Sequence, residues 1–185
     1  MGKVIGGASM SLDGFINDHN GDVSRLYPDM EELHTAEFMQ ESIHSTGAVV
    51  MGRHAYDMAN GDFTGYEYQV PIFVLTHHAP QQVAKGETGA FKFHFVAERV
   101  EDVIARARAA AREKNVMVVG GASVFQQCLK AGLLDVIEIG IMPVLLGKGL
   151  RLFDEMSVAS VDLEKIKVVE TKMRTELLFR VIKRH

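Results

Sequence analysis

The sequence predicts an α/β fold in which the sheet ends in antiparallel C-terminal strands. Short apolar runs rich in β-branched residues alternate with helix-like segments through most of the chain. From about Ser160 the pattern changes to two long strand-like segments that join near Thr171–Met173. No internal repeat and no linker-like stretch divides the sequence, so residues 1–185 are expected to form one domain.

The N-terminal half is expected to contain three strands and two helices. Lys3–Ser9 has a strand pattern and is followed by a glycine-rich loop to about Pro28. Asp29–Ser45 has a helical pattern, with Asp29 at the N-cap and acidic residues in the first turn. Ala48–Met51 is a short buried strand, Gly52 opens a turn into a further helix, and Val70–Thr76 is the third strand.

The C-terminal half continues the alternation before the final strand pair. After a strand at Phe91–Ala97, Glu98–Lys114 is an amphipathic helix with one apolar face: Val100, Val103, Ile104 and Ala107. Val116–Val119 is a buried strand, and a helix follows from Gly121 to about Lys130. Asp135–Met142 is a strand that ends at Pro143, before a glycine-interrupted loop over residues 145–153.

Composition argues against several classes of partner. The net charge is −4 and the basic residues are scattered, which disfavours nucleic acid and anionic membranes. The single cysteine, Cys128, cannot form an internal disulfide and is expected to be a small core residue. Without a leader-like N-terminus or an apolar run long enough to cross a bilayer, the sequence predicts a soluble cytoplasmic protein.

Gly120 and Gly121 mark the most informative turn of the chain. They join the strand Val116–Val119 to a helix, and so expose backbone N–H groups at the start of that helix. These donors and the positive end of the helix dipole suit a phosphate, which glycine allows to approach closely. An empty strand-to-helix turn is the alternative that this pair alone leaves open.

Five segments, taken in order, resemble the dihydrofolate reductase superfamily. They are Ser9–Asn17 (SMSLDGFIN), Val49–Asp57 (VVMGRHAYD), Val70–His78 (VPIFVLTHH), Val116–Phe125 (VMVVGGASVF) and Gly132–Phe153 (GLLDVIEIGIMPVLLGKGLRLF). The last segment is similar to the branch that contains the riboflavin-biosynthesis reductase domain. The resemblance spans about residues 3–183 and implies a three-layer α/β/α fold with a mostly parallel sheet. Members of this branch are commonly dimers, so a homodimer is expected.

The resemblance implies an NADPH site at the carboxyl ends of the strands. Gly120, Gly121, Ala122, Ser123 and Val124 would hold the diphosphate, with Gly52 close by, and the Gly120–Gly121 peptide would be cis. Arg53 and His54 after Gly52, and Thr76 and His77 after the third strand, would meet the adenosine 2′-phosphate and adenine. For Arg53, the planar guanidinium suits bidentate binding of phosphate.

The same resemblance places the nicotinamide over the end of the first strand. Ala8 and Ser9 would lie beneath the ring, and Ile16 would close over it from the loop. The loop Met10–Pro28 is expected to act as a lid, since its glycines permit motion. Within it, Asp13-Gly14 is either part of the reaction site or a plain turn.

The sequence departs from the riboflavin enzymes where they bind substrate. Those enzymes carry a lysine where this chain has Gly7, and a glutamate where it has Val119. The Trp-Ile-Thr-like element that follows their lid is not reproduced by Ser24-Arg25-Leu26. These differences argue against their phosphoribosyl substrate.

No single acid stands out as the proton donor. Dihydrofolate reductases place a carboxylate early in the helix after the lid, a position near Ala36 here, with Glu32 and Glu37 the nearest acids. Either could be buried beside the cofactor with a raised pKa, or both could be solvated helix residues. A polar stripe of His34, Glu37, Glu41 and His44 is expected to face solvent rather than bind metal. Gly147-Lys148-Gly149 lacks the spacing of an ATP-binding loop.

The sequence therefore predicts an NADPH-dependent reductase that acts on a small pterin- or aminopyrimidine-like heterocycle. Ser9, Asp13, Glu32 and Glu37 are its candidate catalytic residues, and no metal is expected. A true riboflavin-pathway or dihydrofolate reductase, and a non-catalytic NADPH-binding protein, are the alternatives.

Overall fold

The structure, a computed structural model, describes residues 2–154 and 160–183, and its core is one eight-stranded sheet. The strand order is β4-β3-β2-β5-β1-β6-β8-β7. The strands are β1 (Val4–Ser11), β2 (Thr46–Gly52), β3 (Ile72–Leu75), β4 (Phe93–Val96), β5 (Asn115–Val119), β6 (Val136–Met142), β7 (Asp162–Glu170) and β8 (Thr175–Ile182). All pairings from β4 to β6 are parallel, whereas β8 pairs antiparallel with β6 and β7. The expected three-layer fold with antiparallel C-terminal strands is confirmed.

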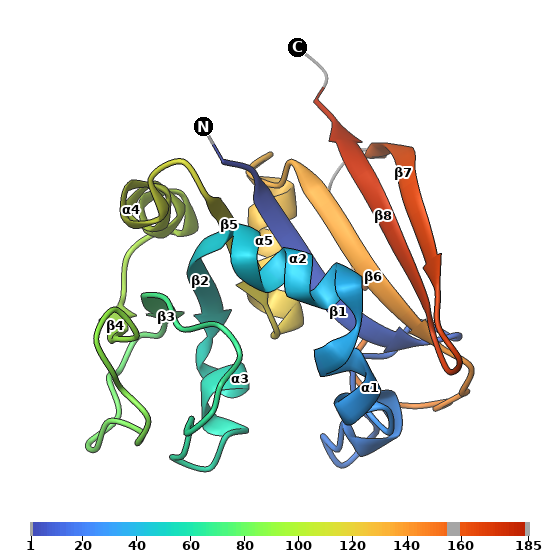
Figure 1. The fold of residues 1–185 in the computed structure, drawn as a ribbon, viewed down its shortest axis with the longest axis horizontal. Coiled ribbons are helices and arrows are strands. Elements are labelled where there is room, and N and C mark those ends of the chain that lie inside the picture. The colour runs from blue at the N-terminus through green and yellow to red at the C-terminus, as the bar shows by residue number, and fades with distance from the viewer. Residues whose placement is uncertain (1, 155–159, 184–185) are drawn as a thin grey trace.

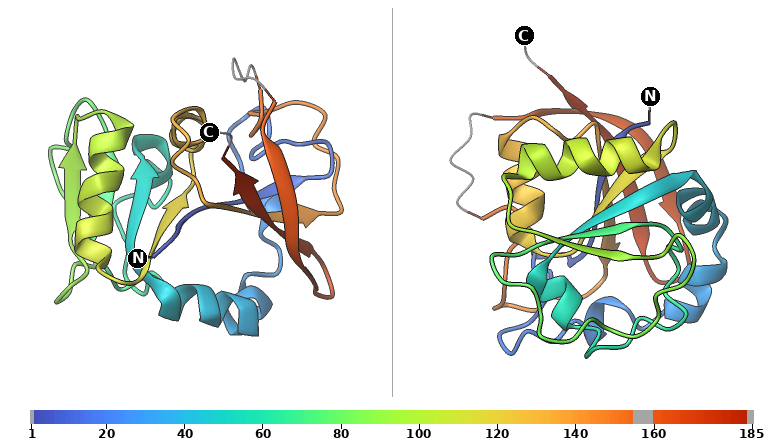
Figure 2. Two further views of the ribbon diagram at one scale, coloured as in Figure 1. Left: turned by 90° about the horizontal axis from the view of Figure 1, so that it is seen from above. Right: turned by 90° about the vertical axis from the view of Figure 1, so that its left-hand side faces the viewer.

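Helices lie on both faces of this sheet (Figures 1 and 2). On one face lie α4 (Val100–Ala111) and α5 (Ala122–Lys130); on the other lie α1 (Met30–Thr35) and α2 (Glu37–Ser45). The short α3 (Arg53–Asp57) follows β2, and a 3-10 turn, η1 (Ser24–Leu26), precedes α1. The predicted apolar face of α4 is buried, as is Cys128, whose thiol pKa is raised to about 12 by burial.

Two apolar clusters fill the two sides of the sheet. One packs α4 and α5 against β-strand residues such as Val50 and Val118. The other is aromatic and gathers Tyr56, Phe63, Tyr68 and Phe93 around Met51. Because alternate strand residues point to opposite faces, Val50 and Met51 belong to different clusters.

The predicted single helix over Asp29–Ser45 is wrong in one respect. Ala36 is extended (φ −64°, ψ 135°), so the segment is two helices, α1 and α2. Asp29 is the N-cap of α1, as predicted, but its side chain makes no capping hydrogen bond, because its carboxylate is buried against Arg174. The break also divides the polar stripe on which His34 and Glu41 were placed, and no metal-binding group of three His, Cys, Asp or Glu residues occurs among residues 2–154 and 160–183.

The described helices include none that is both long and apolar enough to span a bilayer.

Candidate functional site

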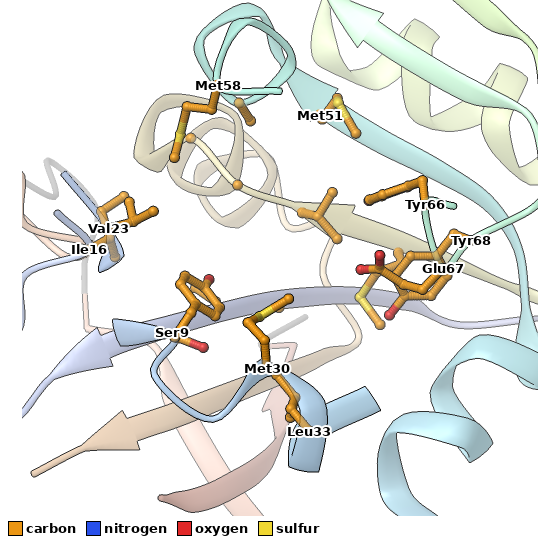
Figure 3. Close-up of a pocket in the computed structure, with 18 of the residues that line it drawn as sticks. Ser9, Ile16, Val23, Met30, Leu33, Met51, Met58, Tyr66, Glu67 and Tyr68 are labelled. Atoms are coloured by element: carbon orange, nitrogen blue, oxygen red, sulfur yellow. The ribbon is translucent and has the colours of Figure 1, made fainter. Parts of the chain in front are cut away.

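A cavity of about 590 Å³ lies over the carboxyl ends of the central strands, on the face that carries α1. Its floor is formed by β1, β5, β6 and β8, and its walls come from the loop after β1, α1, α3 and the segment before β3. Figure 3 shows Met30 and Leu33 of α1 on one side and Met51 and Met58 on the other. An apolar wall of this kind excludes water from a reacting group.

Six of the residues predicted to bind the cofactor line this cavity: Ala8, Ser9, Ile16, His54, Gly120 and Gly121. They come from three separate segments, the end of β1 with its loop, the start of α3, and the β5–α5 turn. The structure therefore brings together residues more than a hundred positions apart at one edge of the sheet.

The two strand-to-helix turns touch at their glycines. A Cβ added to Gly120 would lie 2.7 Å from the Cβ of Ala55, and one at Gly52 would lie 3.1 Å from Cγ2 of Val124. Gly121, the N-cap of α5, faces Gly52, with 3.9 Å between its would-be Cβ and the Cα of Gly52. Only residues without side chains allow the two turns to pack this closely.

No side chain caps the start of α5 among the described residues, where Ala122 and Val124 are buried and Ser123 is exposed. The expectation of a cis Gly120–Gly121 peptide is wrong, since residues 2–154 and 160–183 contain no cis bond. Positive φ values of 63° and 74° at the two glycines turn the chain instead.

Arg53, Thr76 and His77 lie outside the cavity, at the adjoining ends of β2 and β3. Arg53 donates from Nε to both carboxylate oxygens of Asp57 (2.8 and 2.9 Å) and from Nη1 to the carbonyl of His78 (2.7 Å). Thr76 Oγ1 donates to the same carbonyl at 2.9 Å, and His77 is exposed. A polar cluster does form at the expected place, but the Arg53 guanidinium already has an acidic partner.

Glu32 and Glu37 are both exposed and neither lines the cavity. The inward-facing residue of α1 is Leu33, and the helix break at Ala36 turns Glu37 into the first residue of α2. Of the two alternatives for these acids, the structure therefore matches solvated helix residues, and the expectation of a buried acid beside the cofactor is wrong for both.

Asp13 is a loop anchor away from the cavity. Its carboxylate accepts hydrogen bonds from Ser11 Oγ (2.6 Å) and from the backbone N–H groups of Leu146 and Gly147. The Ser11 hydroxyl and those N–H groups lower the pKa of Asp13 to about 2. Because these bonds stabilise the anion and use its lone pairs, Asp13 is unsuited to donate a proton.

The loop after β1 is held more firmly than the lid hypothesis assumed. Between residues 11 and 17 it bonds to the 144–152 segment through Leu12 N–H to the Val144 carbonyl (2.9 Å) and Ile16 N–H to the Leu150 carbonyl (2.8 Å). Asn17 Oδ1 also accepts from Leu150 N–H at 2.8 Å. These hydrogen bonds oppose the prediction that the whole of Met10–Pro28 moves as a lid, since they fix residues 11–17 to the 144–152 segment.

A buried ionic network that the sequence reasoning missed lies under Ser9. The Arg174 guanidinium binds both oxygens of Asp29 (2.7 and 2.6 Å), Ser9 Oγ (2.9 Å) and the Leu26 carbonyl (3.0 Å), and it contacts Glu176 at 3.4 Å. These hydrogen bonds from Arg174 lower the pKa of Asp29. Ser9 is thereby fixed as an acceptor from Arg174, which leaves its hydroxyl proton available to a ligand in the cavity.

Besides Asp62, which accepts a hydrogen bond from the Thr64 N–H, three carboxyl groups line the cavity, on Glu67, Glu138 and Glu176. Burial raises the pKa of each, and that of Glu138 rises to about 7, with repulsion from Glu176 as the second cause. Glu67 stands beside Tyr68 at the side of the cavity (Figure 3). A lone acid in an apolar strand, such as Glu138 in Val136–Met142, is the signal that could have revealed this group.

His34 also lines the cavity, and its Nε2 atom is buried without a hydrogen-bond partner in the described part of the chain. Since an unpaired buried nitrogen is costly, this atom is a candidate contact for a bound ligand.

Comparisons with known proteins agree with this architecture. Residues 2–176 match the RibD C-terminal domain family. A Shewanella sp. PV-4 protein assigned to riboflavin biosynthesis is 25% identical, with a TM-score of 0.79 over 98% of this chain and 99% of the other. No curated protein sequence matched.

Two more distant structures share the fold. A diaminohydroxyphosphoribosylaminopyrimidine deaminase/5-amino-6-(5-phosphoribosylamino)uracil reductase from Thermotoga maritima is 19% identical, with a TM-score of 0.67. The match covers 98% of this chain but only 57% of the Thermotoga maritima chain. Dihydrofolate reductase from Enterococcus faecalis, complexed with NADP(H), is 16% identical with a TM-score of 0.65, covering 98% of this chain and 97% of that one.

Proposed function

Since this chain belongs to the RibD C-terminal domain family, we propose that it is an NADPH-dependent reductase of a small pterin- or aminopyrimidine-like heterocycle. The observation that carries the proposal is the contact between Gly52 and Gly120–Gly121 at the edge of the cavity. Because Gly120 and Gly121 also line the cavity, a diphosphate bound at this turn would lie directly beside an apolar chamber that can take a flat ring. The NADP(H) complex of the Enterococcus faecalis reductase, which has the same fold, supports the choice of cofactor.

We assign the diphosphate to Gly52 and to the backbone of Gly120–Val124, and the nicotinamide to the surface formed by Ala8, Ser9 and Ile16. Arg53, His54, Thr76 and His77 lie on the adenosine side. When bound, the reduced nicotinamide supplies a hydride. The chain's own residues then bind the ring at Ser9, exclude water with the methionines and aromatic groups of the wall, and provide a proton from the buried acids.

The shape of the floor favours a substrate other than the phosphoribosyl compound named for the Thermotoga maritima enzyme. Gly7 and Val119, which replace the lysine and glutamate expected of riboflavin reductases, are register partners on β1 and β5. Both line the cavity, so both differences fall where a substrate would lie.

We further propose that the protein acts in the cytoplasm as a homodimer. The edge strand β7 carries three apolar side chains that are each more than 40% exposed: Leu163, Ile166 and Val168. Exposed apolar side chains on an edge strand are typical of a surface that another chain covers. A second copy of the chain would cover it.

Binding of NADPH tests the proposed function directly. Purified protein should show a saturable rise in Tm with NADPH and slower amide exchange at residues 120–124. If neither effect is observed, both the proposed reductase function and the alternative of a non-catalytic NADPH-binding protein are contradicted. Steady oxidation of NADPH with dihydrofolate or a related pteridine would exclude the non-catalytic alternative, and rescue of a strain that lacks its riboflavin reductase would instead support the riboflavin-pathway reading.

A further inference from the structure

Glu138 occupies the position on the cavity floor next to Gly7, its register partner on β1. A row of register partners crosses the sheet in the order Met51, Val119, Gly7, Glu138, Leu178. All but Leu178 line the cavity, so this row forms its floor. A Cβ added at Gly7 would meet only Sδ of Met117, at 3.2 Å. The Met117 thioether therefore takes the place of a side chain at Gly7, and a flat ring in the cavity would lie over this sulfur and beside the Glu138 carboxyl.

This part of the cavity also adjoins the proposed nicotinamide position. Along β1, Gly7 is followed by Ala8 and Ser9, whose partners on β6 are Ile139 and Gly140. Glu138 therefore lies on β6, the strand next to the proposed nicotinamide surface on β1. It is two residues before Gly140, so Glu138 and Gly140 face the same side of the sheet. A ring that lies over Gly7 can contact the nicotinamide on one side and the Glu138 carboxyl on the other.

Among the four acids that line the cavity, Asp62 accepts a hydrogen bond from the Thr64 N–H, whereas neither Glu138 nor Glu67 has a hydrogen bond to another residue in the described part of the chain. Glu176 contacts the Arg174 guanidinium, and its carboxylate oxygen fills the space above Gly140, 2.7 Å from a would-be Cβ. Glu67 belongs to the segment before β3, beside Tyr68 and electrostatically coupled to His34. The Glu176 carboxylate repels the negative charge of an ionised Glu138, whereas the Lys167 ammonium on β7 attracts it. The Tyr68 phenol also interacts electrostatically with Glu138.

We propose that Glu138 is a catalytic residue that binds the substrate and protonates it, and that the substrate is a small unphosphorylated heterocycle with an amino group next to a ring nitrogen. The protonated carboxyl would donate its O–H to the ring nitrogen, while its carbonyl oxygen accepts an amino N–H. This inference rests on the proposed reductase function.

The reduction balances with this single acid. A hydride from NADPH forms the new C–H bond at the carbon of a C=N group, while the Glu138 proton forms the new N–H bond at its nitrogen. The C=N π bond breaks, the heterocycle is reduced by two electrons, and NADPH becomes NADP⁺. The Glu138 carboxylate then regains a proton from water.

Charge within the cavity excludes a phosphate arm. Arg174 is the cavity's only arginine or lysine among the described lining residues, and its guanidinium is saturated by Asp29, Ser9, Leu26 and Glu176. Four carboxyl groups line the same cavity, including that of Asp62, and the position where riboflavin reductases carry lysine is Gly7. A phosphorylated substrate would meet repulsion without a compensating cation.

The test uses 2-aminopyrimidine as the probe, pyrimidine as its control, and protein saturated with NADP⁺ so that no turnover occurs. Ligand-detected NMR should show 2-aminopyrimidine binding roughly tenfold tighter than pyrimidine, the worth of two hydrogen bonds. Glu138→Leu should abolish the difference. Glu138→Gln, which keeps one donor and one acceptor, should retain part of it.

The pH dependence separates proton donation from mere contact. In the wild-type protein the preference for 2-aminopyrimidine should fall as the pH rises above about 7, because the ionised carboxylate has no O–H to donate. In Glu138→Gln it should not change with pH. The exposed Glu164→Gln, on β7, is the control for substitution of a glutamate on the same sheet.

Several results would overturn the inference. Equal binding of the two probes, or loss of the preference in Glu67→Gln or Glu176→Gln but not in Glu138→Leu, would remove Glu138 from this role. Competition by ribose 5-phosphate for the 2-aminopyrimidine site would contradict the exclusion of phosphate. If the variants still show the NADPH-induced rise in Tm, the proposed reductase function survives such a failure; if even the wild-type protein lacks it, that function fails first.

Discussion

Arg174 is the residue on which most of the candidate site depends. Its guanidinium is 1% exposed and all three of its nitrogens donate hydrogen bonds. As the single arginine or lysine among the described residues that line the cavity, Arg174 offsets the charge of Asp29 and part of the charge of Glu176. It holds Ser9 in place but makes no hydrogen bond to Glu138.

The buried Arg174–Asp29 pair should show a large cost when only one partner is removed. Asp29→Ala leaves a buried, uncompensated guanidinium, and we expect a loss of about 3–5 kcal/mol in the free energy of unfolding, measured by urea denaturation. Glu164→Ala, which breaks the exposed pair with Arg180, should cost less than about 1 kcal/mol. Similar losses in the two variants would contradict the importance of the buried pair.

Glu138 should make stability depend on pH in the direction opposite to a salt-bridged acid. Its native pKa of about 7 lies above the unfolded value of 4.5, so the native state binds the proton more tightly. The stability that protonation contributes is full below pH 4.5 and is lost as the pH rises to about 7. The slope is at most about 1.4 kcal/mol per pH unit. In Glu138→Gln, the same urea titrations at several pH values should show a shallower slope; an unchanged slope would assign the effect to Glu67 or Glu176.

Arg53 should determine the preference for NADPH over NADH. Arg53→Ala should weaken NADPH binding by roughly tenfold or more and leave NADH binding nearly unchanged, as measured by titration calorimetry. Asp57→Asn should act in the opposite direction, because it releases the guanidinium from its present partner. Arg99→Ala, an exposed arginine beside α4, serves as the control. An unchanged preference in Arg53→Ala would remove Arg53 from the cofactor site.

At the scale of elements, the site is built by two strand-to-helix turns, β2–α3 and β5–α5, that meet through glycine. The carboxyl ends of parallel strands bring these turns to one edge of the sheet. The floor is completed by β6 and β8, where antiparallel pairing places Glu176 opposite Gly140. The cofactor side of the cavity thus comes from the parallel part of the sheet, and the acidic side from its junction with the hairpin.

Substitution of Gly120 should separate backbone strain from loss of the cofactor site. Gly120→Ala combines a φ of 63° with a Cβ 2.7 Å from Ala55, whereas Gly132→Ala has a φ of 65° and an open surrounding. Both should lose about 1–2 kcal/mol of stability from the left-handed conformation. Only Gly120→Ala should also lose the NADPH-induced rise in Tm. Equal NADPH responses in the two variants would contradict the diphosphate assignment.

Sequence reasoning located most elements to within a few residues, but not the acids. Apolar periodicity identified β2, β5 and α4 because their buried positions follow a regular period. It failed at Ala36, an ordinary residue in a helix, where tertiary packing imposes an extended conformation. The glycines at 52, 120 and 121 were found because glycine has few other reasons to occur there. The Asp29–Arg174 pair was missed because its partners lie 145 residues apart and neither carries a local signal.

For the whole molecule, the β7–β8 hairpin forms one end of the sheet and carries two kinds of residue. Arg174 and Glu176 of the hairpin turn and β8 point to the cavity, whereas Leu163 and Val168 of β7 are exposed. In Figure 1 the hairpin stands at the margin of the sheet, on the side away from β4. The same hairpin therefore serves both the candidate site and the proposed subunit contact.

The proposed dimer should depend on the apolar residues of β7. Wild-type protein should sediment at twice the chain mass at micromolar concentration, and Leu163→Lys/Val168→Lys should sediment at the mass of one chain. Val83→Lys changes a loop residue of similar exposure, 46% against 44% and 43%, and should leave the mass unchanged. A monomeric wild-type protein, or a dimeric double variant, would exclude this surface.

The hydrogen bond between Arg174 and Ser9 joins residues 165 positions apart, near opposite ends of the chain. During synthesis from the N-terminus, Ser9 leaves the ribosome long before Arg174 exists. The central strand β1 must also wait for β5 and β6, its two neighbours. The acidic side of the cavity, which needs Arg174 and Glu176, is therefore completed only after the β7–β8 hairpin has been made, later than the strands that form the cofactor side.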